Sequence, residues 1–152
     1  MIDFLKKDGN SKLQEVLAEY AFLKDLILDG IRNRSKVLVS RSDFDAFGYD
    51  VLVQLEGQKR LVKIQLKATN GKAKVWDVHK SLLEDEDGYV VLVKIEESNN
   101  DLCFNYYTIS GPKDHILERK PKVAHSRKCQ LRIADLSPIE KDSLIRTFFE
   151  SK

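Results

Sequence analysis

The stretch DVLVQLEGQKRLVKIQLK, residues 50–67, is the part of this chain around which the rest is organised. Two runs of alternating β-branched and polar residues flank a polar turn that contains Gly57, a pattern that predicts a β-hairpin. With Gly57 and Gln58 as the two central residues of a type II′ turn, Asp50 is expected directly opposite Gln65.

Side chains on a strand alternate between its two faces. One face of the predicted hairpin is apolar and is assigned to the core: it carries Val51, Val53, Leu55, Val62, Ile64 and Leu66. The other, solvent-facing side gathers Asp50, Gln65 and Lys67 at one end of the hairpin. Oxygen ligands of this kind suit hard cations such as Mg²⁺. The alternative is a solvated face on which Asp50 and Lys67 form a weak cross-strand ion pair.

The composition is that of a globular protein, with 42% apolar and 33% charged residues. A length of 152 residues fits one domain with a sizeable core. No apolar run approaches the roughly 20 residues that cross a bilayer, and the start lacks the pattern of a secretory signal, so we expect a cytoplasmic protein without a membrane partner. Cys103 and Cys129 lack metal-ligand spacing and are expected to be reduced.

Residues 11–29 predict a helix, with Gly30 as its C-terminal stop. The expected apolar stripe consists of Leu13, Val16, Leu17, Tyr20, Leu23 and Ile27. Glu19 lies on the apolar flank of this helix, where a carboxylate must pair with or coordinate something, because burying it unpaired is costly. The alternative is that Glu19 reaches solvent beside Lys24 or Arg32.

Further strands are expected at residues 36–40, 74–78, 89–95 and 102–109, with a short helix at 79–86. The nearly continuous apolar run 89–95 indicates a strand buried on both faces. The sequence SPIE, residues 137–140, is a capping box that predicts the start of a C-terminal helix. This order of elements predicts an α/β fold with a mixed central β-sheet flanked by helices.

A basic segment begins at Gly111. Such a segment is typical of proteins that contact phosphate backbones, although surface clusters of Lys and Arg without a partner are also frequent. The candidate nucleic-acid-binding residues are Lys113, Arg119, Lys120, Lys122, Arg127 and Lys128.

Over residues 11–109 the chain resembles the PD-(D/E)XK nuclease superfamily, which has the restriction-endonuclease-like fold, and within it the small bacterial endonuclease-like domains. The residues that carry the resemblance are Glu19 in the first helix, Gly30 at its end, the Gly48-Tyr49-Asp50 entry into one hairpin strand, and Ile64-Gln65-Leu66-Lys67-Ala68 in the other.

The resemblance implies a catalytic set of Asp50, Gln65, Lys67 and Glu19. Asp50, Gln65 and the backbone carbonyl of Leu66 would bind Mg²⁺ or Mn²⁺. Glu19 would hold a metal-bound water or a second ion, and Lys67 would orient or help to deprotonate the attacking water. A divalent ion suits this chemistry because phosphodiester cleavage develops negative charge on oxygen atoms. The implied partner is DNA, and nucleases of this kind often pair as homodimers to cut both strands.

Gln65 departs from the family pattern, which usually has an acid at this position. A neutral amide oxygen supplies less charge to hold the cation. The sequence predicts a single nuclease-like domain over residues 1–152, with its core at 11–109 and a basic segment and last helix at 111–150. Two functions are consistent with this domain. One is a metal-dependent endonuclease that hydrolyses DNA, and the other is a nuclease-fold module that binds nucleic acid or a partner protein without cutting.

Overall fold

The computed structural model describes residues 1–42, 48–119 and 126–150. Its helices are α1 (Ile2–Leu5), α2 (Ser11–Arg32), α3 (Lys80–Glu84) and α4 (Asp114–Leu117). Its strands are β1 (Val37–Arg41), β2 (Val51–Leu55), β3 (Val62–Thr69), β4 (Val75–His79), β5 (Gly88–Ser98), β6 (Asp101–Ile109), β7 (Lys128–Arg132) and β8 (Leu136–Ile139). Three short helical turns are η2 (Ile133–Asp135), η3 (Lys141–Ser143) and η4 (Arg146–Glu150).

Six strands form one sheet in the order β1-β2-β3-β5-β6-β8. Strands β3 and β5 run parallel, whereas the other neighbouring pairs are antiparallel. Strands β4 and β7 pair with each other as a separate two-stranded ribbon. The predicted α/β class with a mixed central sheet is confirmed.

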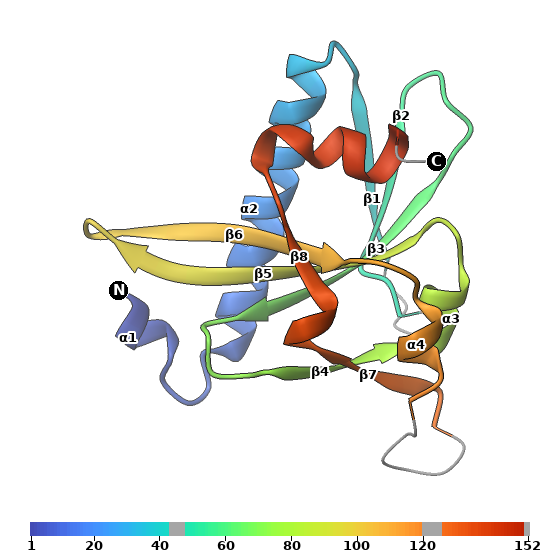
Figure 1. The fold of residues 1–152 in the computed structure, drawn as a ribbon. Helices are drawn as coiled ribbons and strands as arrows, with labels where there is room; N and C mark the ends of the chain where they lie inside the picture. The colour runs from blue at the N-terminus through green and yellow to red at the C-terminus, as the bar shows by residue number, and fades with distance from the viewer. Residues whose placement is uncertain (43–47, 120–125, 151–152) are drawn as a thin grey trace.

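Both faces of the sheet are covered (Figure 1). On one face, α2 and the C-terminal segment share a core that includes Phe22, Leu26 and Phe148. On the other face, a second core contains the apolar residues of α3, α4 and the β4–β7 ribbon together with Val90 of β5. Because β5 contributes to both cores, the prediction that residues 89–95 are buried on both faces is confirmed.

The register of the β2–β3 hairpin is the predicted one, with Val51 opposite Ile64 and Val53 opposite Val62. The predicted type II′ turn is wrong. The N–H of Gln58 donates to the carbonyl of Leu55, so the turn is centred on Glu56 and Gly57. Leu55 pairs with Val37 of β1, and the hairpin strands have separated by this point. Next to the turn, β2 therefore pairs with β1 and no longer with β3.

Helix α2 continues through Gly30 to Arg32, so the prediction that Gly30 stops the helix is wrong. A Cβ atom at Gly30 would lie 2.5 Å from Cγ2 of Val37 and 2.9 Å from the carbonyl oxygen of Ser35. Gly30 is needed for this close approach to β1. The helix is also rotated from the prediction, since Ala18, Phe22 and Leu26 are buried while Leu13, Tyr20 and Ile27 are exposed. None of the described helices is long and apolar enough to cross a membrane.

The capping box predicted at residues 137–140 is wrong, because Ser137, Pro138 and Ile139 belong to β8 and pair with β6. Pro138 is tolerated there because β8 lies at the edge of the sheet, where a missing backbone N–H leaves no ladder bond unmade. Helical turns begin only at Lys141, where the buried carboxylate of Asp29 accepts a hydrogen bond from the N–H of Ile145 at 2.8 Å. A long-range cap from α2 thus replaces the local one.

Candidate functional site

A cleft of about 600 Å³ lies beside β3 and the N-terminal half of α2. All five residues that the sequence assigned to metal binding or catalysis line it: Glu19 from α2, Asp50 just before β2, and Gln65, Leu66 and Lys67 from β3. The β4–β7 ribbon supplies a second wall. The fold therefore brings these five residues to one concave surface.

Asp50 is fixed against the neighbouring strand. Its Oδ2 atom accepts a hydrogen bond from the N–H of Leu66 at 2.7 Å, and its own N–H donates to the carbonyl of Ile64 at 2.8 Å. This second bond departs from the register of the β2–β3 ladder, which ends at Val51 opposite Ile64, so Asp50 does not pair directly with Gln65 as predicted. The carboxylate is nevertheless held at the N–H of Leu66, between Gln65 and Lys67.

Gln65 is buried, with 7% of its surface exposed, so its predicted position on a solvent-facing side is wrong. Gln65 pairs with Val90 of β5, which belongs to the second core, so its side chain lies on the face of the sheet that the β4–β7 ribbon covers. The Oε1 atom of Gln65 is buried and has no hydrogen-bond donor among the described residues. An acceptor buried without a donor costs about 1–3 kcal/mol, so this oxygen has the environment expected of a cation ligand.

Glu19 also has its Oε1 atom buried, without a partner that meets hydrogen-bond geometry in the described chain. Nε of Arg41 in β1 lies 2.7 Å away, close enough for an ion pair, although the N–H does not point at the oxygen. The alternative, in which Glu19 reaches solvent beside Lys24 or Arg32, is wrong, since these two cations lie near Asp25 and Asp29. Glu19 lines the cleft together with Glu15, which lies one turn earlier on α2.

Lys67 is half-buried at the cleft. No described residue forms a hydrogen bond or an ion pair with its ammonium group, so the alternative of a cross-strand ion pair with Asp50 is not what the structure contains. A cation held beside a carboxylate but unpaired with it remains available to an anionic ligand.

The oxygen atoms that line the cleft are suitable ligands for a hard divalent cation. In the described part of the chain they do not form a dense cluster of charged side chains. Within residues 1–42, 48–119 and 126–150, no group of three or more Asp, Glu, His or Cys side chains is placed to hold a metal ion. The fit rests on two carboxylates, Asp50 and Glu19, and on the buried amide oxygen of Gln65. Mg²⁺ binds through few protein carboxylates and keeps several waters, which this set allows.

The second wall of the cleft was not recognised in the sequence. Trp76, Asp77 and His79 come from β4, and Lys128 comes from β7. Strand β7 was read only as part of a basic segment, because its charged residues obscured the alternation of buried Cys129 and Leu131. That alternation was the signal that could have revealed it.

The basic candidates are dispersed. Lys113 donates to the carbonyl oxygens of Gly88 at 2.7 Å and of Asp85 at 3.2 Å. Arg119 makes a bidentate contact with Asp135 at 2.5 and 2.6 Å. Lys120 and Lys122 lie outside the described residues. Arg127 and Lys128 are exposed, and Lys128 lines the cleft.

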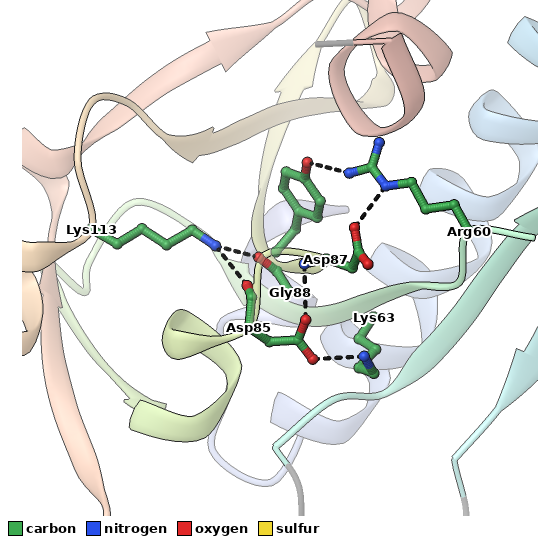
Figure 2. A network of polar contacts seen from close by, with 7 residues as sticks. Arg60, Lys63, Asp85, Asp87, Gly88 and Lys113 are labelled. Carbon is green, nitrogen blue, oxygen red and sulfur yellow. Dashed lines mark hydrogen bonds and ion pairs between the residues drawn. The ribbon is translucent and has the colours of Figure 1, made fainter. Parts of the chain in front are cut away.

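A polar network positions the start of β3 relative to β5 (Figure 2). Nζ of Lys63 lies 2.6 Å from Asp85, and Nε of Arg60 lies 2.7 Å from Asp87. The hydrogen bond from Lys63 lowers the pKa of Asp85. Lys113 reaches the same turn from the other side (Figure 2). These contacts fix the parallel β3–β5 pair at the end opposite to Lys67, and they assign Lys113 to the scaffold.

No protein-family model matches the chain, and no curated protein matches it. Among solved structures, the chain is similar to that of a bacterial homing endonuclease, I-Ssp6803I, with 18% sequence identity and a TM-score of 0.36. The match covers 80% of this chain and 73% of that one.

Proposed function

We propose that this chain is a metal-dependent endonuclease-like protein of the restriction-endonuclease-like type that hydrolyses phosphodiester bonds in DNA. The observation that carries the proposal is the buried Oε1 atom of Gln65, which lacks a hydrogen-bond donor in the described chain, together with Glu19, whose carboxylate reaches the same cleft. Both residues line the cleft that also contains Asp50 and Lys67. A buried amide oxygen without a donor, such as that of Gln65, is costly unless a cation or water satisfies it.

Each residue has a distinct task. Asp50, held by the N–H of Leu66, supplies the negative charge of the Mg²⁺ or Mn²⁺ site. Gln65 and the carbonyl of Leu66 add neutral oxygens, and Glu19 adds a second carboxylate. When bound, the divalent cation stabilises the negative charge that develops on the phosphate oxygens. Lys67, unpaired with any described residue, orients the attacking water and contacts the phosphate.

A second function is favoured by two observations. Gln65 stands where an acid would bind a cation more strongly, and Arg41 lies 2.7 Å from Glu19, where it neutralises one of the two carboxylates. Under this alternative the chain is a nuclease-fold module that holds nucleic acid or a partner protein without cutting. Arg127 and Lys128 would then supply phosphate contacts, which are independent of base sequence.

In this proposed function, residues 1–152 form one nuclease-like domain that acts on DNA in the cytoplasm. The C-terminal segment belongs with its core, because Leu144, Ile145 and Phe148 pack in the same cluster as Phe22 of α2. A homodimer would place two clefts on the two strands of a duplex.

The test is incubation of the purified protein with supercoiled plasmid, linear duplex and branched DNA in Mg²⁺, in Mn²⁺ and in EDTA. We expect cleavage with either divalent ion and none in EDTA. The preparation of an Asp50→Asn variant by the same protocol controls for contaminating nucleases. Binding to all three substrates without any metal-dependent cleavage would select the binding module instead.

A further inference from the structure

The β4–β7 ribbon presents two basic side chains to the cleft from directly opposed positions. His79 of β4 and Lys128 of β7 are cross-strand partners, so their side chains project from the same face of the ribbon. Both line the cleft that contains Asp50, Gln65 and Lys67. The two walls therefore come from different sheets, with the metal-binding candidates on one and a basic pair on the other.

The ring of His79 is held in place by the backbone of Gly48. Gly48 has a φ of +77°, and a Cβ atom there would lie 2.4 Å from Cγ of His79. No side chain can be added at Gly48 without moving the imidazole. Because Gly48 lies only two residues before Asp50, this packing links the position of the ribbon to that of the candidate metal ligand.

Neither head group of the pair is bound to another group in the described part of the protein. Among the described residues, no hydrogen bond joins either imidazole nitrogen of His79, and no ion pair joins the ammonium of Lys128. This contrasts with Lys63, Lys113 and Arg119, whose head groups all bind protein oxygens. A cation left unpaired in a concave site is available for an anionic ligand.

We infer that His79 and Lys128 form a second phosphate-binding subsite, which holds a phosphate of the DNA strand next to the one at Asp50, Gln65 and Lys67. The inference rests on the proposed function and adds to it a specific means of positioning the strand. Holding a neighbouring phosphate fixes the strand along the cleft, and such positioning brings the reacting groups together before the chemical step. His79 and Lys128 are positioning residues in this scheme.

Asp77 should weaken the attraction between this face of the ribbon and a phosphate. It lies two residues before His79, on the same ribbon face, and also lines the cleft. A carboxylate there repels phosphate, so neutralising Asp77 should tighten DNA binding while neutralising Lys128 should weaken it. Opposite effects from two residues of one ribbon face would be specific to a phosphate subsite.

The experiment measures binding of fluorescently labelled single-stranded and duplex DNA in EDTA, as a function of salt, for the wild type and for Lys128→Gln, His79→Gln and Asp77→Asn. Lys59→Gln is the matched control, since Lys59 is an exposed lysine of the β2–β3 turn outside the cleft. One lost phosphate contact lowers the slope of log affinity against log salt by about 0.7 for single strands and about 0.9 for duplex. At 0.1 M salt this corresponds to about five-fold to eight-fold weaker binding.

We expect this loss for Lys128→Gln, a smaller loss for His79→Gln, tighter binding for Asp77→Asn and no change for Lys59→Gln. If Lys128→Gln behaves like Lys59→Gln, or if the wild type does not bind DNA, the subsite is refuted. Because these measurements are made without a divalent ion, they are independent of cleavage. A wild type that binds through Lys128 but never cuts would refute the hydrolytic function and leave the subsite standing, whereas metal-dependent cleavage with binding indifferent to Lys128 would refute the subsite only.

Discussion

The carboxylate of Asp50 accepts a hydrogen bond from the N–H of Leu66 at 2.7 Å, which joins the start of β2 to β3 between Gln65 and Lys67. This bond fixes one oxygen of Asp50 relative to the two side chains with which it is proposed to act. Its importance is geometric, because the same bond can be accepted by an amide oxygen, which lacks the charge that a cation requires.

Asp50→Asn therefore separates the charge from the hydrogen bond. In the wild type, Mg²⁺ or Mn²⁺ should raise the melting temperature with increasing concentration, since a ligand that binds only the folded state stabilises it, by about 2.7 kcal/mol at 100 times its Kd. In Asp50→Asn this rise should vanish, while the melting temperature in EDTA stays close to that of the wild type. Thermal unfolding followed by circular dichroism measures both. A variant that keeps the full rise would exclude Asp50 as a ligand.

Gln65→Glu should act in the opposite direction. The substitution adds a negative charge next to Asp50, so it should tighten binding of a divalent ion and enlarge the metal-dependent rise in melting temperature. In EDTA the new carboxylate is buried without a counterion, and the variant should be less stable than the wild type. Gln54→Glu, on the same hairpin but outside the cleft, is the control. Equal metal responses in the two variants would contradict the proposed site.

The hairpin could be predicted from its own residues, because one of its faces is buried. Shifting the register by one residue would expose Val51, Val53 and Ile64, so the alternation leaves a single pairing. The turn could not be predicted in the same way, because Leu55 is taken up by β1, a strand that lies before the hairpin in the sequence. The two-faced burial of β5 was likewise readable from its continuous apolar run.

The errors share a physical cause, which is that a distant contact overrides a local signal. Pro138 follows a residue suited to capping a helix, yet pairing with β6 makes the segment an edge strand. Gly30 fits a helix stop, yet the approach of Val37 explains it. The candidate site was predicted only as far as it lies on α2 and the hairpin. His79 and Lys128 meet only when β4 pairs with β7, and no local pattern reports that pairing.

Gly30→Ala tests the contact between α2 and β1. Alanine in a helix interior is favoured over glycine by about 1 kcal/mol, so helix propensity alone predicts stabilisation. The added Cβ would lie 2.9 Å from the carbonyl oxygen of Ser35, whose N–H is itself bonded to the carbonyl of Gly30 at 2.8 Å. This backbone cannot move away freely, and we expect destabilisation by about 1–3 kcal/mol.

Urea denaturation measures the effect of Gly30→Ala. The double variant Gly30→Ala, Val37→Ala should recover part of the loss, because Cγ2 of Val37 is the other atom that the new Cβ would meet. Stabilisation of the single variant would show that the helix and β1 are not packed this closely.

Asp135 should contribute stability that depends on pH. Its hydrogen bonds with Arg119 lower its pKa from an ordinary 3.8 to about 2. A carboxyl whose pKa is lower in the folded state stabilises the fold above pH 3.8 and loses this contribution as the pH falls towards 2. The difference corresponds to about 2 kcal/mol, at about 1.4 kcal/mol per pKa unit.

Asp135→Asn should therefore be destabilised at pH 7 by about 2 kcal/mol or more, and the gap to the wild type should narrow between pH 4 and pH 2. Arg119→Ala should be destabilised by about 3 kcal/mol at pH 7, because it leaves a buried carboxylate without its partner. Asp114→Asn, which removes an exposed carboxylate of α4, is the control. A pH-independent difference for Asp135→Asn in urea denaturation would contradict the assigned pKa.

Lys67→Ala distinguishes DNA cleavage from DNA binding. The ammonium of Lys67 has no ion pair with a described residue, so its removal should leave the free energy of unfolding nearly unchanged. Were Lys67 instead bound to Asp50, its loss would lower stability slightly and leave activity intact. An interaction made chiefly in the transition state affects turnover and not binding, so the variant should bind DNA with nearly wild-type affinity but cleave it about 10²- to 10³-fold more slowly. Lys59→Ala controls for the loss of one positive charge.

Single-turnover cleavage in Mn²⁺ and titration with labelled DNA in EDTA measure the cleavage rate and the DNA affinity of Lys67→Ala separately. Cleavage by Lys67→Ala at the wild-type rate would show that the catalytic assignment is wrong. If the wild type binds DNA but does not cleave it in the presence of any divalent ion, the neutral oxygen of Gln65 is too weak a ligand to support the reaction, and the protein is a binding module.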